Sequence, residues 1–190
     1  MDVMVRELRW DDADALISNY YSLLDEAKED PLFGITQPPQ RPDLPSEYRW
    51  FSELYAAVLR GDAVAYVAEA DGRVVGMAEV RRRATRVEFS HIGVLGMYVV
   101  KGYRGKGIGK ALMRKTMEGC NGKFEVIVLE VLTTNTACLG FLAYVFEQQI
   151  EGGRGCRVEG GCYEEGECQV TCREHVACNP GPHGPGQAVN

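Results

Sequence analysis

A glycine-rich turn at residues 104–110, with the sequence RGKGIGK, carries the residue types and spacing best suited to chemistry in this chain. The turn directly precedes a predicted helix with apolar or small residues at every fourth position: Ile108, Leu112, Thr116 and Cys120. Glycines leave the backbone N–H groups at a helix start uncovered, and these groups and the helix dipole bind anions. Arg104, Lys106 and Lys110 could neutralise the bound charge. The turn therefore predicts a site for phosphate groups.

Two common nucleotide motifs contain similar glycines, and neither fits this turn. A P-loop needs a Gly five residues before its Gly-Lys pair and a Ser or Thr after it, where this chain has Arg104 and Ala111. A dinucleotide-binding GxGxxG starting at Gly105 needs a third glycine where this chain has Lys110. One plain alternative stays open, in which the turn only starts a helix and its basic residues are solvated.

The chain up to about residue 146 predicts a single α/β domain around this turn. Alternating or β-branched apolar runs predict strands, and apolar residues three to four apart predict helices. Asp71-Gly72 favours a tight hairpin, and the proline-rich residues 30–45 predict a long loop. The expected order is a strand at 3–8, helices starting near Asp11 and Ser46, strands at 64–70, 73–82 and 87–100, the helix after the glycine turn, and a strand at 124–132.

One long segment of this domain resembles a known family. GMYVVKGYRGKGIGKALM, at residues 96–113, is similar to motif A of the GCN5-related N-acetyltransferases (GNAT), whose key positions are matched by Arg104, Gly107 and Gly109. The family's order of elements is the order expected here, so the resemblance covers about residues 3–146. It implies an α/β GNAT fold, with a mixed central sheet flanked by helices and with its fourth and fifth strands splayed to admit acetyl-CoA as co-substrate.

The resemblance also implies how acetyl-CoA would be held. Backbone amides of the glycine turn would bind the pyrophosphate, and main-chain groups of the fourth strand would pair with the pantetheine arm. An amide on that strand, that of Val99 or its neighbour, would polarise the acetyl carbonyl. The implied cofactor-binding residues are Met97, Tyr98, Val99, Arg104, Gly105, Lys106, Gly107, Ile108, Gly109, Lys110 and, just after the fifth strand, Asn135.

Acetyl transfer to an amine needs a base, because only the unprotonated amine can attack the thioester. His91, at the start of the predicted fourth strand, is the first candidate, with Glu88 and Glu79 as substitutes. Each of them could equally be a structural or surface residue. The resemblance implies a Tyr as acid for the leaving thiolate, but Leu142 occupies that position, which leaves Tyr144 as the candidate acid or as a core residue.

The chain changes character after residue 150, so we expect an acetyltransferase domain at 1–150 and a separate tail at 151–190. The tail holds five of the seven cysteines, many glycines and prolines, and few apolar residues, which predicts irregular structure that adds little stability. Zinc binding by Cys168, Cys172, His175 and Cys178 is one alternative, although their spacing matches no common module. Another is that the tail does not derive from the gene's usual reading frame.

The composition of the chain argues against nucleic acid and membranes as binding partners. A net charge of -6 gives no field that gathers nucleic acid, and no apolar run reaches membrane length. The first residues lack the basic start and apolar stretch of a signal peptide, so we expect a cytoplasmic location. The expected function is transfer of an acetyl group from acetyl-CoA to a primary amine of a small molecule, a protein N-terminus or a lysine. A non-catalytic acyl-CoA-binding protein is the alternative, and a homodimer is compatible with the sequence.

Overall fold

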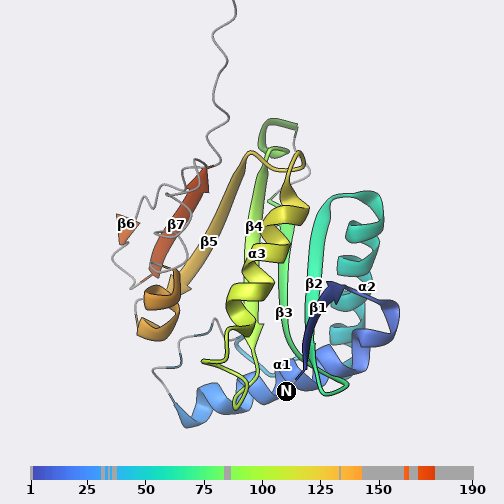
Figure 1. Cartoon of the computed structure of the whole chain (residues 1–190), viewed down its shortest axis with the longest axis vertical. Coiled ribbons are helices and arrows are strands. Elements are labelled where there is room, and N and C mark those ends of the chain that lie inside the picture. The colour runs from blue at the N-terminus through green and yellow to red at the C-terminus, as the bar shows by residue number, and fades with distance from the viewer. Residues whose placement is uncertain are drawn as a thin grey trace, which may run out of the picture.

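A mixed seven-stranded sheet forms the centre of the molecule (Figure 1). The computed structural model describes residues 2–30, 33, 35, 38–83, 87–132 and 134–142, and the backbone of two further strands at 161–162 and 167–173. The strands lie in the order β1-β2-β3-β4-β5-β7-β6, and β4 and β5 are parallel whereas the other neighbours are antiparallel. Their bounds are β1 (Val3–Glu7), β2 (Ala63–Ala70), β3 (Arg73–Arg82), β4 (Ile92–Val99), β5 (Val126–Leu132), β6 (Gly161–Cys162) and β7 (Glu167–Arg173).

The hairpin between β2 and β3 turns at the predicted dipeptide. Asp71 and Gly72 have φ angles of 50° and 76°, the left-handed backbone that a tight turn between twisted strands requires. The hairpin prediction is therefore confirmed, and β3 pairs with β4 along its other edge.

β4 and β5 pair at one end and diverge at the other (Figure 1). Their pairing joins residues 92–94 to residues 126–128, whereas β4 continues to Val99 and β5 to Leu132. β5 keeps its other edge paired with β7 along its whole length. The splay of the fourth and fifth strands is therefore confirmed, and it leaves one edge of β4 without a strand partner in the described part of the chain.

Helices cover both faces of the sheet. α1 (Ala13–Glu29) and α2 (Leu44–Arg60) share one core with β2 and β3, in which Phe51 and Leu54 are fully buried. α3 (Ile108–Cys120) packs on the opposite face, where Leu112 is fully buried. The order of elements predicted for the domain is confirmed. None of the helices in the described part of the chain combines the length and apolar character needed to span a bilayer.

Both N-terminal helices start at residues other than those predicted. α2 is capped by Asp43, whose carboxylate accepts a 2.8 Å hydrogen bond from the Ser46 amide, so Ser46 lies inside the first turn instead of capping it. Pro45 fits there because the first turn of a helix needs no N–H from it. α1 follows a 3-10 turn, η1 (Trp10–Asp12), which carries the chain past the expected start near Asp11.

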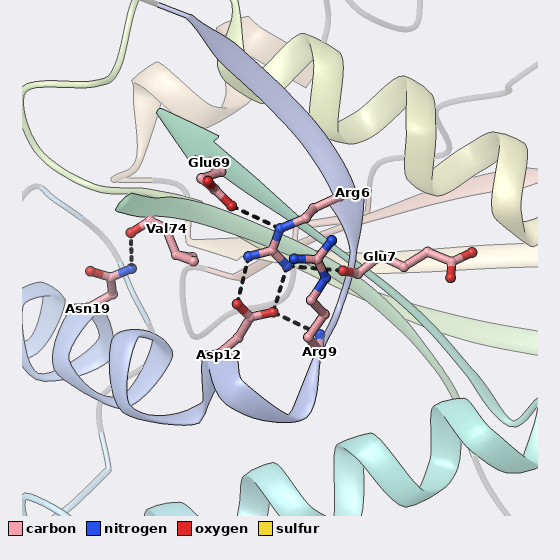
Figure 2. Close-up of polar contacts among 7 residues, drawn as sticks. All are labelled: Arg6, Glu7, Arg9, Asp12, Asn19, Glu69 and Val74. Atoms are coloured by element: carbon pink, nitrogen blue, oxygen red, sulfur yellow. Dashed lines mark hydrogen bonds and ion pairs between the residues drawn. The ribbon is translucent and has the colours of Figure 1, made fainter. Parts of the chain in front are cut away.

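Polar contacts tie α1 to the sheet (Figure 2). The Arg6 guanidinium on β1 makes two 2.8 Å hydrogen bonds to the Asp12 carboxylate and one of 2.9 Å to Glu69 on β2. These carboxylates, Asp12 above all, raise the pKa of Arg6 further above its usual range. Midway along α1, the Asn19 side chain donates to the Val74 carbonyl on β3 at 2.9 Å. The helix is thus held at its start and middle, which fixes where its last turns lie.

The prediction that the tail is irregular is wrong for residues 167–173. These residues form β7, which pairs with β5 from Val126↔Arg173 to Leu132↔Glu167 and carries β6 on its other edge. The physical reason is that β5 would otherwise be an apolar edge strand, and its unpaired backbone groups gain hydrogen bonds from an added strand. Within the described residues no group of metal-ligating side chains is found, and His175 and Cys178 lie outside them.

We expect removal of residues 156–190 to destabilise the domain. Loss of β7 would uncover the edge of β5, whose sequence VIVLEVL has one charged residue in seven, and should favour aggregation. The melting temperature should fall by more than about 10 °C, well above the few degrees expected per kcal/mol at this size. Thermal unfolding of the shortened chain checks this, and an unchanged melting temperature would show that β7 adds nothing to the fold.

Candidate active site

The glycine turn enters α3 with an uncapped helix start. Gly105 and Gly107 have φ angles of 72° and 81°, and Gly107 is the N-cap of α3, so no side chain caps the helix. A Cβ built on either glycine would meet no atom of the described residues within 4 Å. The first amides of a helix, here those of Ile108 and Gly109, have no acceptor within the helix. Backbone donors, helix dipole and open space together fit a phosphate group.

Arg104 is bound by groups of the protein itself. Its Nε donates to the Val99 carbonyl at 2.7 Å, and its two Nη atoms donate to the Glu26 carboxylate on α1 at 2.5 and 2.8 Å. Its guanidinium carbon also lies 4.5 Å from the ring centroid of Phe33. The sequence predicted that Arg104 would neutralise phosphate, but the structure matches its charge with Glu26. We infer that Arg104 braces the glycine turn between β4 and α1.

Glu26 provides a test of this brace. If Arg104 acts by holding the turn, Glu26→Gln should weaken acetyl-CoA affinity about five- to tenfold, because the bidentate charged contact is lost. If Arg104 instead binds phosphate directly, removal of the competing carboxylate should strengthen binding. Calorimetric titration with acetyl-CoA separates the two results, with Asp25→Asn one residue earlier on α1 as a control for the lost charge.

The other two basic residues of the turn are exposed. Lys106 donates from Nζ to the Gly102 carbonyl at 2.6 Å, and its charge lies 5.4 Å from the ring centroid of Tyr103. Lys110 lies in the first turn of α3. Their charges remain near the helix start, so either can approach a diphosphate there by a change of rotamer.

The strand register shows which backbone groups of β4 turn towards β5. The Arg83 amide donates to the Ile92 carbonyl, and the Val100 amide donates to the Val75 carbonyl, both at 2.9 Å. Even-numbered residues of β4 therefore bond β3, and odd-numbered ones direct their N–H and C=O groups to the other side. Beyond residue 94, where β5 leaves, these are the groups of residues 95, 97 and 99.

Two of the three residues predicted to pair with the pantetheine arm have the required direction. Met97 and Val99 turn their amides to the side that β5 has left, although the Val99 carbonyl is taken by Arg104. Tyr98 lies between them, so its backbone bonds β3 and its side chain packs against the core under α1 and α2. Residues 97 and 99 therefore form an edge of β4 that has no strand partner among the described residues, here called the free edge, and it ends five residues before Arg104.

On the face covered by α1 and α2, β3 carries a carboxylate beside this part of β4. Glu79 pairs with Gly96, and a Cβ built on Gly96 would lie 3.7 Å from Glu79 Oε1. Oε2 accepts a 2.8 Å hydrogen bond from Arg81 Nε, and the Arg81 guanidinium lies 4.9 Å from the ring centroid of Trp50. Burial raises the pKa of Glu79, and the Arg81 charge offsets part of that rise.

Two of the predicted catalytic residues, His91 and Glu88, lie in the connection that precedes β4. His91 lies in the turn before β4, and its carbonyl accepts hydrogen bonds from two amides at the start of β5, of 2.9 and 3.2 Å. Glu88 is exposed in the 3-10 turn η3 (Val87–Phe89) of the same connection. Six residues of extended chain, about 20 Å, separate His91 from Met97. Tyr144 lies outside the described residues.

After β5, the chain forms a helix at residues 136–142. Asn135 caps it, since its Oδ1 accepts a 3.0 Å hydrogen bond from the Cys138 amide. Phe141 packs near Gly109 of α3, 3.6 Å from a Cβ built there. Leu142, at the position of the family's acid, is only 3% exposed and belongs to the core. Sequence reasoning missed Glu26 and Phe141. Their contact partners are distant in the chain, and no neighbouring residue in the sequence signals such a contact.

Comparisons with known proteins agree with this geometry. The model of the acetyltransferase (GNAT) family matches residues 20–144. Among solved structures, the chain is similar to YncA, a putative acetyltransferase from Salmonella typhimurium solved with acetyl-CoA, at a TM-score of 0.70 and 18% identity, covering 95% of this chain and 99% of that one. An N-acetyltransferase from Staphylococcus aureus Mu50 gives a TM-score of 0.68 at 18% identity, with coverages of 91% and 99%.

A third similar structure is a ribosomal-protein-alanine N-acetyltransferase from Brucella melitensis, with a TM-score of 0.64, 22% identity and coverages of 90% and 98%. No curated protein matches the chain at the level of sequence. The likeness to the solved structures shows the fold, and the family model extends over most of the domain. The chain therefore belongs to the acetyltransferase (GNAT) family, whose members use acetyl-CoA as co-substrate.

Proposed function

We propose that this protein transfers the acetyl group of acetyl-CoA to a primary amine. The observation that carries the proposal is that two complementary binding elements adjoin each other. The free edge of β4 ends at Val99, and the chain then passes through the Arg104 brace into the uncapped start of α3 at Gly107. A diphosphate at the helix start would place a linked amide-containing arm along that edge.

The backbone of this chain supplies the groups that the reaction needs at the thioester. The amides of Met97 and Val99, on the side that β5 has left, can donate to the oxygen of the acetyl carbonyl. Negative charge develops on that oxygen as the amine attacks, so a fixed donor there lowers the barrier. Because the donors belong to a strand that is paired with β3 on its other side, they need little reorganisation.

The acceptor is proposed to be a small-molecule amine or a protein N-terminus or lysine. A net charge of -6 favours a cationic partner over an anionic one. Similar structures include both a ribosomal-protein-alanine N-acetyltransferase and a putative phosphinothricin N-acetyltransferase, so the fold is compatible with either size of acceptor.

The proposal is tested by measuring release of free coenzyme A thiol from acetyl-CoA with a panel of amines. The panel should contain polyamines, amino acids, aminoglycosides and short peptides with a free N-terminus or lysine. Amine-dependent release well above the rate without amine, with the acetylated amine identified by mass spectrometry, is the expected result. Acetyl-CoA binding without release for any amine would refute catalysis.

That second outcome corresponds to a second candidate function, a non-catalytic acyl-CoA-binding protein. Leu142 favours it, because a buried core leucine stands where the family's acid is expected. The same panel separates the two functions, since both predict acetyl-CoA binding and only an enzyme releases thiol.

A further inference from the structure

We propose that Glu79 is the base that takes the proton from the acceptor amine, and that the amine reaches the thioester over Gly96. This inference rests on the proposed function and assigns the amine-side residue of the same site. Three features support it: where Glu79 lies in the sheet, which oxygen it leaves available, and how near it is to the backbone donors.

Gly96 marks an open position on an interior strand. α2 packs on β2 and α1 packs on β3 on this face of the sheet, and Gly96 on β4 is exposed although β3 pairs with it on one side. A residue larger than glycine here would put its side chain beside Glu79, since a Cβ built on Gly96 would lie 3.7 Å from both Cγ and Oε1 of Glu79. A substrate amine can therefore approach β4 at this point and meet the carboxylate.

The Glu79 carboxylate is held with one oxygen turned to this opening. Oε2 is fixed by the 2.8 Å hydrogen bond from Arg81 Nε, and the Arg81 guanidinium is itself placed over Trp50. Among the described residues, Arg81 is the group that binds this carboxylate, and it does so at Oε2 and not at Oε1. Only 15% of the Glu79 side chain is exposed, which limits its movement, and Oε1 lies 3.7 Å from a Cβ built on the exposed Gly96.

Few charged groups surround Glu79 in the described part of the chain. Arg81 lies on the same strand, and Tyr98 on β4 shares its face, with its hydroxyl buried and with a pKa that burial raises. Across the sheet Glu79 pairs with Ala65 of β2, and α2 contributes Trp50 at Arg81. Because burial outweighs the Arg81 charge, the pKa of Glu79 is raised, which brings the carboxylate closer to the operating pH of a general base.

Glu79 is near the reacting groups, whereas the other candidate is distant. Gly96 directly precedes Met97, whose amide faces the side that β5 has left, and one residue of strand spans about 3.3 Å. His91 is six residues from Met97, about 20 Å along the strand, and no single proton transfer covers that distance. Glu79 thus lies opposite the residue next to this backbone donor, which makes it the better placed of the two candidates to take a proton from the attacking nitrogen.

The transfer conserves atoms and electrons. The amine nitrogen forms a bond to the acetyl carbon and loses one proton to Glu79 Oε1. The carbon–sulfur bond then breaks with its electron pair on sulfur, and the thiolate takes up one proton. Glu79 afterwards returns its proton to solvent, so the carboxylate is restored and the products are the acetylated amine and the free thiol.

The experiment compares Glu79→Gln with wild type, using the amine that wild type acetylates fastest. Glutamine can still accept the Arg81 Nε hydrogen bond, so the fold should persist, which thermal unfolding checks. We expect kcat/KM at pH 7 to fall about a hundredfold, the usual scale for a general base, with acetyl-CoA affinity unchanged. The loss should shrink as pH rises towards the amine pKa, because solvent then deprotonates the amine.

Two further variants complete the design. Glu53→Gln, an exposed carboxylate on α2, should leave the rate unchanged. Glu79→Asp keeps a carboxylate on a shorter side chain, and it should retain more activity than Glu79→Gln with a pH profile like that of wild type. If Glu79 were only structural, the more stable of the two variants, Glu79→Gln and Glu79→Asp, would be the more active one. The presence of a carboxylate would then make no difference to the rate.

The possible results separate a failure of the Glu79 assignment from a failure of the proposed function. An active wild type whose Glu79→Gln variant stays within about threefold at every pH overturns the role of Glu79 alone. The same outcome with a large loss in His91→Gln would move the role to His91. A wild type that binds acetyl-CoA but acetylates no amine in the panel would refute the proposed function, and with it any base.

Discussion

Gly107→Val is expected to abolish acetyl-CoA binding, whereas Gly122→Val is expected to leave it intact. Both glycines have left-handed φ angles, 81° and 74°, and in the part of the chain that the structure describes a Cβ at either would meet no atom within 4 Å. Valine therefore strains the backbone in the same way at both positions, at a cost of about 1–3 kcal/mol. Only at Gly107, the N-cap of α3, would the branched side chain occupy the space assigned to the phosphates.

The pair separates loss of binding from loss of fold. Melting temperatures of the two variants should fall by similar amounts, and calorimetric titration should detect acetyl-CoA binding only for Gly122→Val. An unchanged affinity of Gly107→Val would show that the pyrophosphate lies elsewhere. Loss of binding in both variants would mean that general destabilisation, and not occupancy of the helix start, causes the effect.

Gly93→Ala is expected to destabilise the domain, whereas Gly96→Ala on the same strand should not. A Cβ on Gly93 would lie 2.4 Å from Val80 Cγ1 and 3.1 Å from Phe124 Cγ, in a part of the core where Val80 is fully buried and cannot move aside. Overpacking of this kind costs about 1–3 kcal/mol, which lowers the melting temperature by several degrees at this chain length.

Gly96→Ala should instead affect turnover. Its Cβ would make ordinary contacts of 3.7 Å with Glu79, so the fold can accept it, and alanine in an exposed strand position loses less chain entropy than glycine. The methyl group would, however, stand where the amine approaches. A melting temperature equal to or above that of wild type with a lower kcat/KM is expected. A large loss of stability in Gly96→Ala would contradict the open face assigned to β4.

The parts of the site that depend on residues close together in the chain could be predicted from the sequence. The glycine turn indicates an uncapped helix start, because Gly105 and Gly107 directly precede an amphipathic stripe, and Asp71-Gly72 indicates the β2–β3 hairpin. The splay of β4 from β5 came from the resemblance alone, since no residue type in either strand signals where their pairing ends at Val94.

The parts that depend on contacts between distant residues could not be predicted in this way. Arg104 and Glu26 are 78 residues apart, so a residue expected to bind phosphate proved to be paired with α1. The Glu79 carboxylate was a secondary candidate, because its burial and its place opposite Gly96 depend on the register of β3 and β4. His91 is favoured by its residue type and by its place at the start of the predicted fourth strand, and neither feature gives its distance from Met97.

The strand β7 was not predicted from the sequence, because its cysteines were not counted as apolar strand residues. Cys168, Val170 and Cys172 alternate with polar residues, the period of a strand with one apolar face, and free cysteine behaves as a small apolar residue. Their glycine- and proline-rich surroundings favoured the prediction of irregular structure. Alternation over seven residues was the better guide, since β5 offers an edge along which such a strand can pair.

Backbone amides of the glycine turn and of the free β4 edge are proposed to hold acetyl-CoA. The most direct measurement is the titration of isotope-labelled protein with acetyl-CoA, followed by the amide resonances in NMR spectra. We expect the largest shifts at Gly105, Gly107, Gly109, Met97 and Val99, saturating together, and a smaller shift at Tyr98 because its amide bonds β3. Saturable binding that leaves the turn and the β4 edge unshifted would show that acetyl-CoA binds elsewhere.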